Sequence, residues 1–223
     1  MEKLLHLRDI NQMPPELNDG HAKALALFEE YRSQITSSDK FGIYNTTPAM
    51  QRMLHTVTVD DAVKDSGNRA IPLPPHIREI FLQWHKRMIM AGKISKATQD
   101  EVKRMRFLAH HIPILKPGAK QPFDLSSFRF VLNIGPFGYA INKAPDFAFP
   151  TRIEWRDFAK GKKVFSVLDF QKFFPSIPTD YGALFLHPVG GSYYKYNVVV
   201  QGDRTAPWAA HRVILDMFAD LID

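Results

Sequence analysis

The stretch VFSVLDFQKFFPSIP, residues 164–178, begins with an apolar run that ends in the acidic residue Asp169. The β-type run KVFSVLDF at 163–170 predicts a strand with apolar side chains in a core. A carboxylate at the end of such a strand is a hard oxygen ligand on a rigid element, as a metal-dependent phosphoryl-transfer site requires. An exposed strand-end aspartate without a catalytic role is the alternative, and this stretch alone leaves both open.

Further strands are predicted on both sides of this run. Extended or alternating β-rich segments lie at 111–116, 128–134, 183–189 and 193–200. The pair Gly190–Gly191 separates the last two segments and predicts a hairpin turn, because both glycines can adopt a positive φ.

Helical patterns alternate with these strands. Apolar residues recur at helical spacing from Ile77 to Met88, and Gly92 is placed to end that helix. Thr98 and Glu101 match a capping box, which predicts the start of a second helix. Residues 206–222 and 21–31 also have helical patterns. Interleaved helices and strands indicate a mixed class, and we expect an α+β fold.

Composition sets the broad class of the chain. Its 223 residues are 45% hydrophobic and 12% aromatic, which is typical of a globular protein. The net charge of +6 is compatible with a phosphate-rich partner. The absence of cysteine excludes disulfides, zinc knuckles and a thiol nucleophile. No apolar run reaches the ~20 residues of a membrane span, so we expect an intracellular protein, cytoplasmic or nuclear, with no membrane partner. The nine histidines are expected to be core or surface residues.

Three further positions are candidates for binding phosphate or a nucleotide. Lys116 and Arg129 lie on neighbouring predicted strands, where both can face a polyphosphate. The pair Gln201–Gly202 follows a strand and precedes a helix, where glycine permits close approach of a ligand to the backbone. Two solvated surface cations and an ordinary turn are the alternatives.

The order of these segments resembles reverse transcriptases of LTR retrotransposons and retroviruses. Residues 164–178 resemble the family's motif A, in which an apolar strand ends in a metal-binding aspartate. VVVQGDRTAPWAAHRV at 198–213 resembles motif B, with Gln-Gly, a small residue and proline before a helix. HIPILKPGAK at 111–120 and the segment 128–134 resemble the paired fingers strands. Ile141–Asn142–Lys143 stands at the family's Leu-Asn-Lys turn, and AGKIS at 91–95 is similar to the end of a fingers helix.

The resemblance implies a right-hand polymerase fold of fingers and an incomplete palm. It divides the chain into five parts: a poorly defined leader at 1–70, fingers at 71–143, palm with motif A at 144–181, a fingers hairpin at 182–205 and the motif B palm helix at 206–223. It points to an LTR-, DIRS- or VIPER-like retroelement. The implied activity is RNA-directed DNA polymerisation, in which two Mg²⁺ ions, or Mn²⁺, support transfer of a dNTP to a primer. The implied partners are an RNA or DNA template with its primer, and dNTP.

The family's residue roles carry over to matching positions. Asp169 is implied as a catalytic, metal-binding carboxylate, and the backbone carbonyl of Phe170 as a further metal contact. Phe174 stands at the steric-gate position that excludes a ribose 2′-hydroxyl. Lys116 and Arg129 are implied to hold the triphosphate, and Gln201 with Gly202 to line the floor under the nucleotide. Among the departures, Asp203–Arg204 is an unusual pair after Gln-Gly.

In the family, the paired aspartates of motif C follow the motif B helix, whereas this sequence ends at Asp223. We therefore expect that the 223-residue chain alone does not polymerise, which a primer-extension assay with Mg²⁺ or Mn²⁺ would test. The sequence fits either a fragment of a longer polyprotein, which the missing remainder would complete, or a degenerate copy. A non-catalytic nucleic-acid-binding or interaction module is the alternative function, and an unrelated α+β protein with chance matches is a third interpretation.

Overall fold

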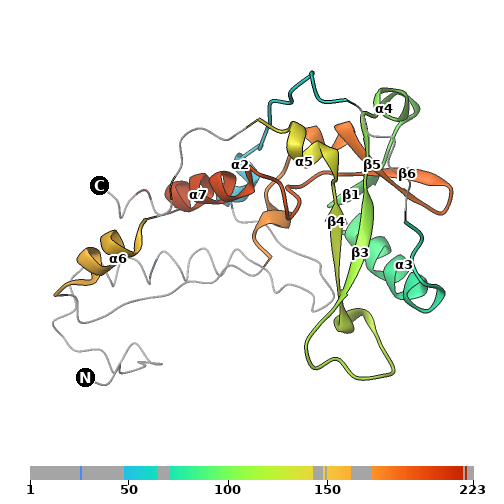
Figure 1. Cartoon of the computed structure of the whole chain (residues 1–223), viewed down its shortest axis with the longest axis horizontal. Coiled ribbons are helices and arrows are strands. Elements are labelled where there is room, and N and C mark those ends of the chain that lie inside the picture. The colour runs from blue at the N-terminus through green and yellow to red at the C-terminus, as the bar shows by residue number, and fades with distance from the viewer. Residues whose placement is uncertain are drawn as a thin grey trace.

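The computed structural model describes residues 48–64, 71–142, 150–161 and 172–217, together with Ala26, Ala148 and Ala219. Within these residues helices and short strands are mixed, which confirms the α+β class in general terms. Figure 1 shows two small sheets beside α3 on one side of the molecule, and α7 with α2 on the other. No helix in the described part is long and apolar enough to cross a membrane.

The larger sheet has four strands in the order β1-β6-β5-β2. Its strands are β1 (Ile94–Lys96), β2 (Phe107–Leu108), β5 (Phe185–Val189) and β6 (Ser192–Tyr196). All neighbours are antiparallel except β2 and β5. The predicted hairpin turn is confirmed, because Gly190 and Gly191 join β5 to β6 with φ of 57° and 78°.

The second sheet is a hairpin of β3 (His110–Leu115) and β4 (Phe128–Asn133). One face is buried by Phe128, Phe130 and Leu132, which follow the period of two expected of a half-buried strand. The other face is open, with Ile112 42% and Ile114 48% exposed. The hairpin therefore has one core face and one solvent face.

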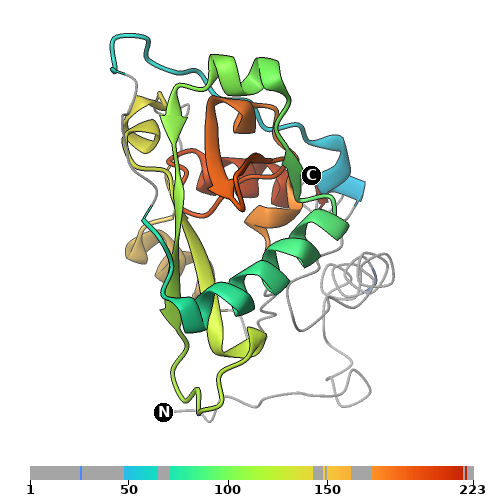
Figure 2. The same cartoon turned by 90° about the vertical axis from the view of Figure 1, so that its right-hand side faces the viewer.

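The helix α3 (Pro75–Met90) covers the buried face of the hairpin, with Phe81 packed against Phe130 at a ring distance of 5.3 Å. Figure 2 shows this helix crossing the hairpin. The predicted stop is confirmed by Gly92, whose φ is 71°. The next helix, α4 (Gln99–Arg104), has the capping box predicted from Thr98 and Glu101, with both reciprocal hydrogen bonds present.

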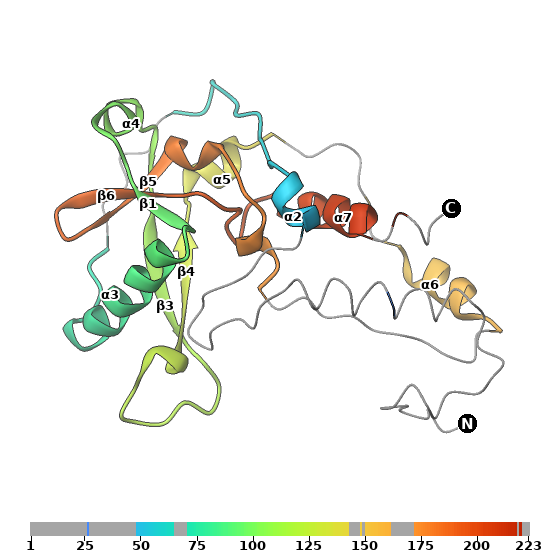
Figure 3. The same ribbon diagram turned by 180° about the vertical axis from the view of Figure 1, so that it is seen from behind.

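Besides the cluster of α3 and the hairpin, two further apolar clusters hold the described part together. The first joins the four-stranded sheet to the hairpin and α5 (Pro136–Ala140), with Phe107, Phe137 and Phe185 fully buried. The second joins α7 (Ala206–Met217) to α2 (Pro48–Arg52), which lie against each other in Figures 1 and 3. The short helix α2 belongs to the segment that the sequence left undefined.

Some predicted elements start or end elsewhere, or fall outside the described residues. Residues 183–184 belong to a 3-10 turn, η4 (Tyr181–Leu184), and β6 ends at Tyr196, so both strands of that hairpin are shorter than predicted. The sequence did not predict α5 or the exposed helix α6 (Arg152–Ala159). The predicted strand at 163–170 and most of the helix at 21–31 lie outside the described residues.

Candidate functional site

The two predicted phosphate-binding cations lie on one face of the β3–β4 hairpin. Arg129 pairs directly with Ile114, and the Lys116 amide donates to the Ser127 carbonyl at 2.9 Å, continuing the same register. Lys116 follows Ile114 by two residues, so its side chain is on the face that carries Arg129. Both residues therefore lie on the open side of the hairpin, Lys116 one residue beyond the end of β3.

Both cations are exposed and available to an anion. The Lys116 ammonium donates to the Ser126 carbonyl oxygen at 2.7 Å, while Arg129 forms no ion pair within the described residues. Exposed Ile112 and Ile114 adjoin them on the same face. Such a surface can attract phosphate by charge and offer apolar area to a base or sugar.

The Gln201–Gly202 turn lies between a buried strand-like segment and α7. Val198, Val199 and Val200 are buried, whereas Gln201 and Gly202 are exposed. Gly202 has φ of 99°, a left-handed conformation that L side chains rarely adopt. The turn therefore presents its backbone to solvent at the start of α7, as the sequence predicts.

The end of the 164–178 stretch lies beside the segment that leads into this turn. The Val199 amide donates to the Ile177 carbonyl at 2.9 Å, and the Thr179 amide donates to the Asn197 carbonyl at 3.0 Å. Phe174 begins the 3-10 turn η3 (Phe174–Ser176), is half-buried, and packs against the cluster of α2 and α7. Phe174 and the Gln201–Gly202 turn therefore belong to one packed region.

The structure does not join all predicted site residues. Within the described part of the chain, no hydrogen bond or ion pair links Lys116 or Arg129 to the Gln201–Gly202 turn. Asp169 and Phe170, the predicted metal-binding residues, lie outside the described residues, as does Lys143. Among the described residues, no three His, Cys, Asp or Glu side chains gather in a group that would hold a metal ion. No metal geometry can therefore be assigned.

A buried polar network, which the sequence did not predict, lies directly after the Gln201–Gly202 turn. The Asp203 carboxylate, 3% exposed, accepts from the Tyr181 hydroxyl, from the Thr205 hydroxyl at 2.8 Å and from the Thr205 amide at 2.7 Å. His55 Nε2 lies 2.6 Å from the Thr205 hydroxyl and 3.7 Å from the carboxylate. Because the Thr205 proton goes to Asp203, its oxygen accepts from His55 Nε2–H.

These contacts keep Asp203 ionised although it is buried. Burial raises the pKa of Asp203, but the nearby His55 ring and hydrogen bonds from Tyr181 and Thr205 outweigh that effect, and the net pKa lies below its usual value. Burial, followed by the Asp203 charge, raises the pKa of Tyr181, so its hydroxyl remains a donor. The one sequence signal of this network was the unusual Asp203–Arg204 pair.

Three histidines form a second buried polar cluster, between α3 and both sheets. His85, His111 and His187 are 3%, 6% and 0% exposed. His85 Nε2 lies 3.1 Å from His187 Nε2, and His111 Nε2 lies 2.9 Å from the Tyr196 hydroxyl. Burial lowers the pKa of all three, that of His85 to about 4. These three histidines are therefore core residues, one of the two alternatives that the sequence left open.

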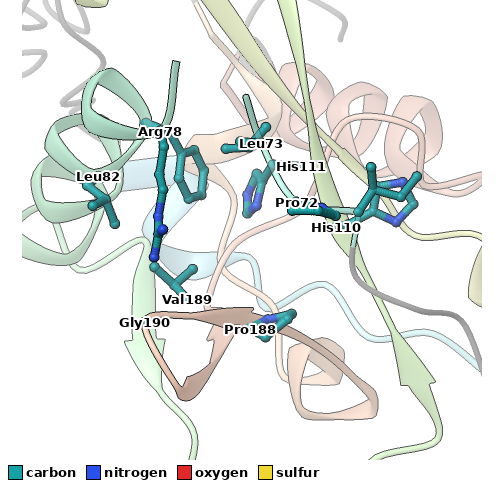
Figure 4. Close-up of a pocket in the computed structure, with 11 residues that line it drawn as sticks. Pro72, Leu73, Arg78, Leu82, His110, His111, Pro188, Val189 and Gly190 are labelled. Carbon is teal, nitrogen blue, oxygen red and sulfur yellow. The ribbon is translucent and has the colours of Figure 1, made fainter. Parts of the chain in front are cut away.

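An open pocket of about 340 Å³ lies between α3, the start of β3 and the β5–β6 turn. Figure 4 shows Arg78 of α3 reaching toward Val189, with His111 and Leu73 on the opposite wall. None of the predicted site residues lines this pocket.

Comparison with known proteins gives no assignment, because no protein-family model and no curated protein matches the chain.

Proposed function

We propose that this chain forms the fingers and part of the palm of a reverse transcriptase from an LTR-, DIRS- or VIPER-like retroelement. In this proposal the fold is a right-hand polymerase fold, and the enzyme extends a primer on an RNA or DNA template with dNTPs. The observation that carries the proposal is the pair of exposed cations, Lys116 and Arg129, on one face of the β3–β4 hairpin.

A second observation supports the same assignment. The Gln201–Gly202 turn emerges at the start of α7 from a segment hydrogen-bonded to residues just beyond Phe174. The end of the stretch that resembles motif A therefore adjoins the start of the stretch that resembles motif B. In the proposed enzyme the nucleotide lies over Gln201 and Gly202, Phe174 limits the space at the sugar, and the hairpin cations hold the phosphates.

The metal-binding part of the proposal depends on residues outside the described ranges. Asp169 and the Phe170 carbonyl would hold Mg²⁺, which neutralises the charge that develops on the transferred phosphoryl group. The described residues contribute binding and orientation. Arg129 supplies a guanidinium that can engage two phosphate oxygens, Lys116 supplies an ammonium that acts as a point charge, and Gly202 lets a ligand approach the backbone closely.

Equilibrium binding of a fluorescent dNTP, mant-dATP, with Mg²⁺ tests this proposal. We expect Asp169→Ala to abolish binding, and Lys116→Met and Arg129→Met each to weaken it about tenfold, the effect of losing one charge-assisted contact. Lys120→Met is the matched control, because Lys120 is exposed in the loop that joins β3 to β4. Absence of dNTP binding, or binding indifferent to the substitutions of Asp169, Lys116 and Arg129, contradicts the proposal.

The open hairpin face also favours a second candidate, a nucleic-acid-binding module without catalysis. Such a module binds RNA through Lys116 and Arg129, and its affinity falls steeply with salt. Each lysine or arginine removed from a phosphate contact lowers the slope of log K against log salt by roughly 0.7–0.9. RNA binding with this salt dependence, but without dNTP binding, would assign the chain to this second class.

A further inference from the structure

The Gln201–Gly202 turn is exposed, yet the residues that follow it are anchored in the core. Asp203 is 3% exposed and Thr205 is 5% exposed. The Asp203 carboxylate accepts from the Thr205 amide two residues ahead, a local turn that aspartate side chains favour. The same carboxylate thereby fixes the backbone between Gly202 and the start of α7.

Three segments distant in sequence meet at this carboxylate. Tyr181, which donates to Asp203, lies just beyond the stretch that ends with Pro178. His55 reaches the network through the Thr205 hydroxyl at 2.6 Å, and its own backbone carbonyl accepts from the Thr179 hydroxyl at 2.7 Å. The His55 ring also packs edge-on against Tyr181, with ring centres 5.7 Å apart. The network therefore ties the turn to residues 55 and 179–181 together.

The neighbouring residue Arg204 anchors the turn on its other side. Its guanidinium donates to the Ile141 carbonyl at 3.3 Å, and Ile141 itself bridges to Val59. The Asp203 side chain thus points into the core, whereas Arg204 is exposed and its guanidinium reaches the backbone of Ile141.

We propose that Asp203, held by Tyr181, Thr205 and His55, is the positioning residue that sets the conformation of the Gln201–Gly202 turn. A buried carboxylate that lost these donors would be strongly destabilised, so the network holds one arrangement of the turn. The consequence for the nucleotide rests on the function proposed above. There, the turn is the floor of the binding site. Asp203 does not contact the dNTP, but its loss displaces the floor and thereby weakens dNTP binding.

Amide hydrogen exchange measured by NMR tests the positioning directly. Asp203→Ala removes the acceptor of the Thr205 amide, and we expect that amide to exchange about tenfold faster or more, as the loss of a hydrogen bond to a charged group predicts. Asp203→Asn keeps an oxygen at the same place, and the Tyr181 hydroxyl can rotate to accept from the new amide. This conservative variant should restore protection to within about threefold of the wild type.

Tyr181→Phe removes one donor but keeps the aromatic ring and two of the donated hydrogen bonds to Asp203, so it serves if Asp203→Ala does not fold. We expect it to speed exchange of the Thr205 amide by about threefold to tenfold. Phe81→Leu is the control, because it weakens the separate α3–hairpin cluster and should lower thermal stability without changing exchange at Thr205. Unchanged exchange in Asp203→Ala or Tyr181→Phe, or equal acceleration in Phe81→Leu, overturns the inference.

The Kd for mant-dATP with Mg²⁺, measured on the same variants, separates this inference from the proposed function. We expect a Kd about tenfold higher in Asp203→Ala, close to wild type in Asp203→Asn, and unchanged in Phe81→Leu. If the wild-type chain binds no dNTP, the proposed function fails, while the exchange data still decide whether Asp203 positions the turn. If dNTP binds and Asp203→Ala leaves its Kd unchanged, the nucleotide part of the inference is wrong.

Discussion

Acid should unfold this protein well above the pH at which its carboxylates become protonated, because its core contains three neutral histidines. The rings of His111 and His187 lie 4.7 Å apart between centres, and those of His85 and His187 lie 5.3 Å apart. A proton on any one ring would place a positive charge in the core, beside the other two imidazole rings. In the described part of the chain, His187 Nδ1 is also buried without a hydrogen-bond partner. His187 is then most stable as the tautomer whose Nε2–H donates to His85. In that tautomer the buried Nδ1 is an acceptor without a partner, which costs less free energy than a buried N–H without a partner.

The size of the effect follows from the pKa of His85, which burial lowers from 6.5 to about 4. Between these two values the unfolded chain binds a proton that the folded chain does not, so stability is full above pH 6.5 and falls as pH decreases toward 4. From pH 7 to pH 5, His85 alone accounts for about 2 kcal/mol. The pKa values of His111 and His187 are lowered well below their usual range, mainly by burial. The contributions of His111 and His187 have the same sign, so the whole cluster loses more stability over this pH range than His85 alone.

Urea unfolding followed by tryptophan fluorescence at pH 5, 6, 7 and 8 measures this dependence. His85→Gln can still hydrogen-bond to His187 but does not titrate, so we expect it to lose about 2 kcal/mol less stability than the wild type between pH 7 and pH 5. His76→Gln is the control, because His76 is exposed on the same helix, and it should keep the wild-type slope. Stability that is flat from pH 7 to pH 5, or an unchanged slope in His85→Gln, would refute the reasoning.

Three further outcomes concern single side chains and the free energy of unfolding in urea. A Cβ at Gly182 would lie 1.8 Å from the Tyr196 carbonyl oxygen, so Gly182→Ala should lower the free energy of unfolding by about 3 kcal/mol or more. Gly138→Ala is the control, because a Cβ there would meet only side-chain atoms at 3.5 Å inside a helix. Its free energy of unfolding should stay within about 1 kcal/mol of the wild type. Lys93 is 6% exposed, and burial lowers its pKa, so Lys93→Met should raise stability by about 1 kcal/mol, and a loss would contradict this account. Thr98→Ala removes the capping box of α4 and should cost about 1 kcal/mol, whereas an unchanged midpoint would show that the cap contributes nothing.

Local signals in the sequence predicted the elements whose causes are local. Gly92 ends α3, Thr98 and Glu101 cap α4, and the Gly190–Gly191 pair makes the hairpin turn. Each depends on residues within one turn of the backbone, so a short pattern contains the necessary information. The same holds for the face shared by Lys116 and Arg129, which follows from the strand period once the two strands pair.

The buried networks could not be predicted in this way, because their members are distant in sequence. His55 and Thr205 are 150 residues apart, and His85 and His187 are 102 residues apart. A single buried histidine or aspartate looks like a surface residue in sequence, since burial depends on packing that no local pattern specifies. The one available signal was the unusual Asp203–Arg204 pair, whose aspartate follows a glycine turn and precedes a helix, a place where an aspartate often bonds to its own backbone.

The segment before Ile71, undefined in the sequence, contains part of the same folded unit as α7. Met50 packs in the α7 cluster, and Arg52 forms an ion pair with Asp216 at 2.7 Å. The Asp60 amide donates to the Ala140 carbonyl at 2.8 Å, so this segment contacts both apolar clusters. Because His55 also supports the network around Asp203, residues 48–64 take part in holding the Gln201–Gly202 turn. The geometry of the candidate nucleotide floor therefore depends on residues upstream of every motif that suggested it.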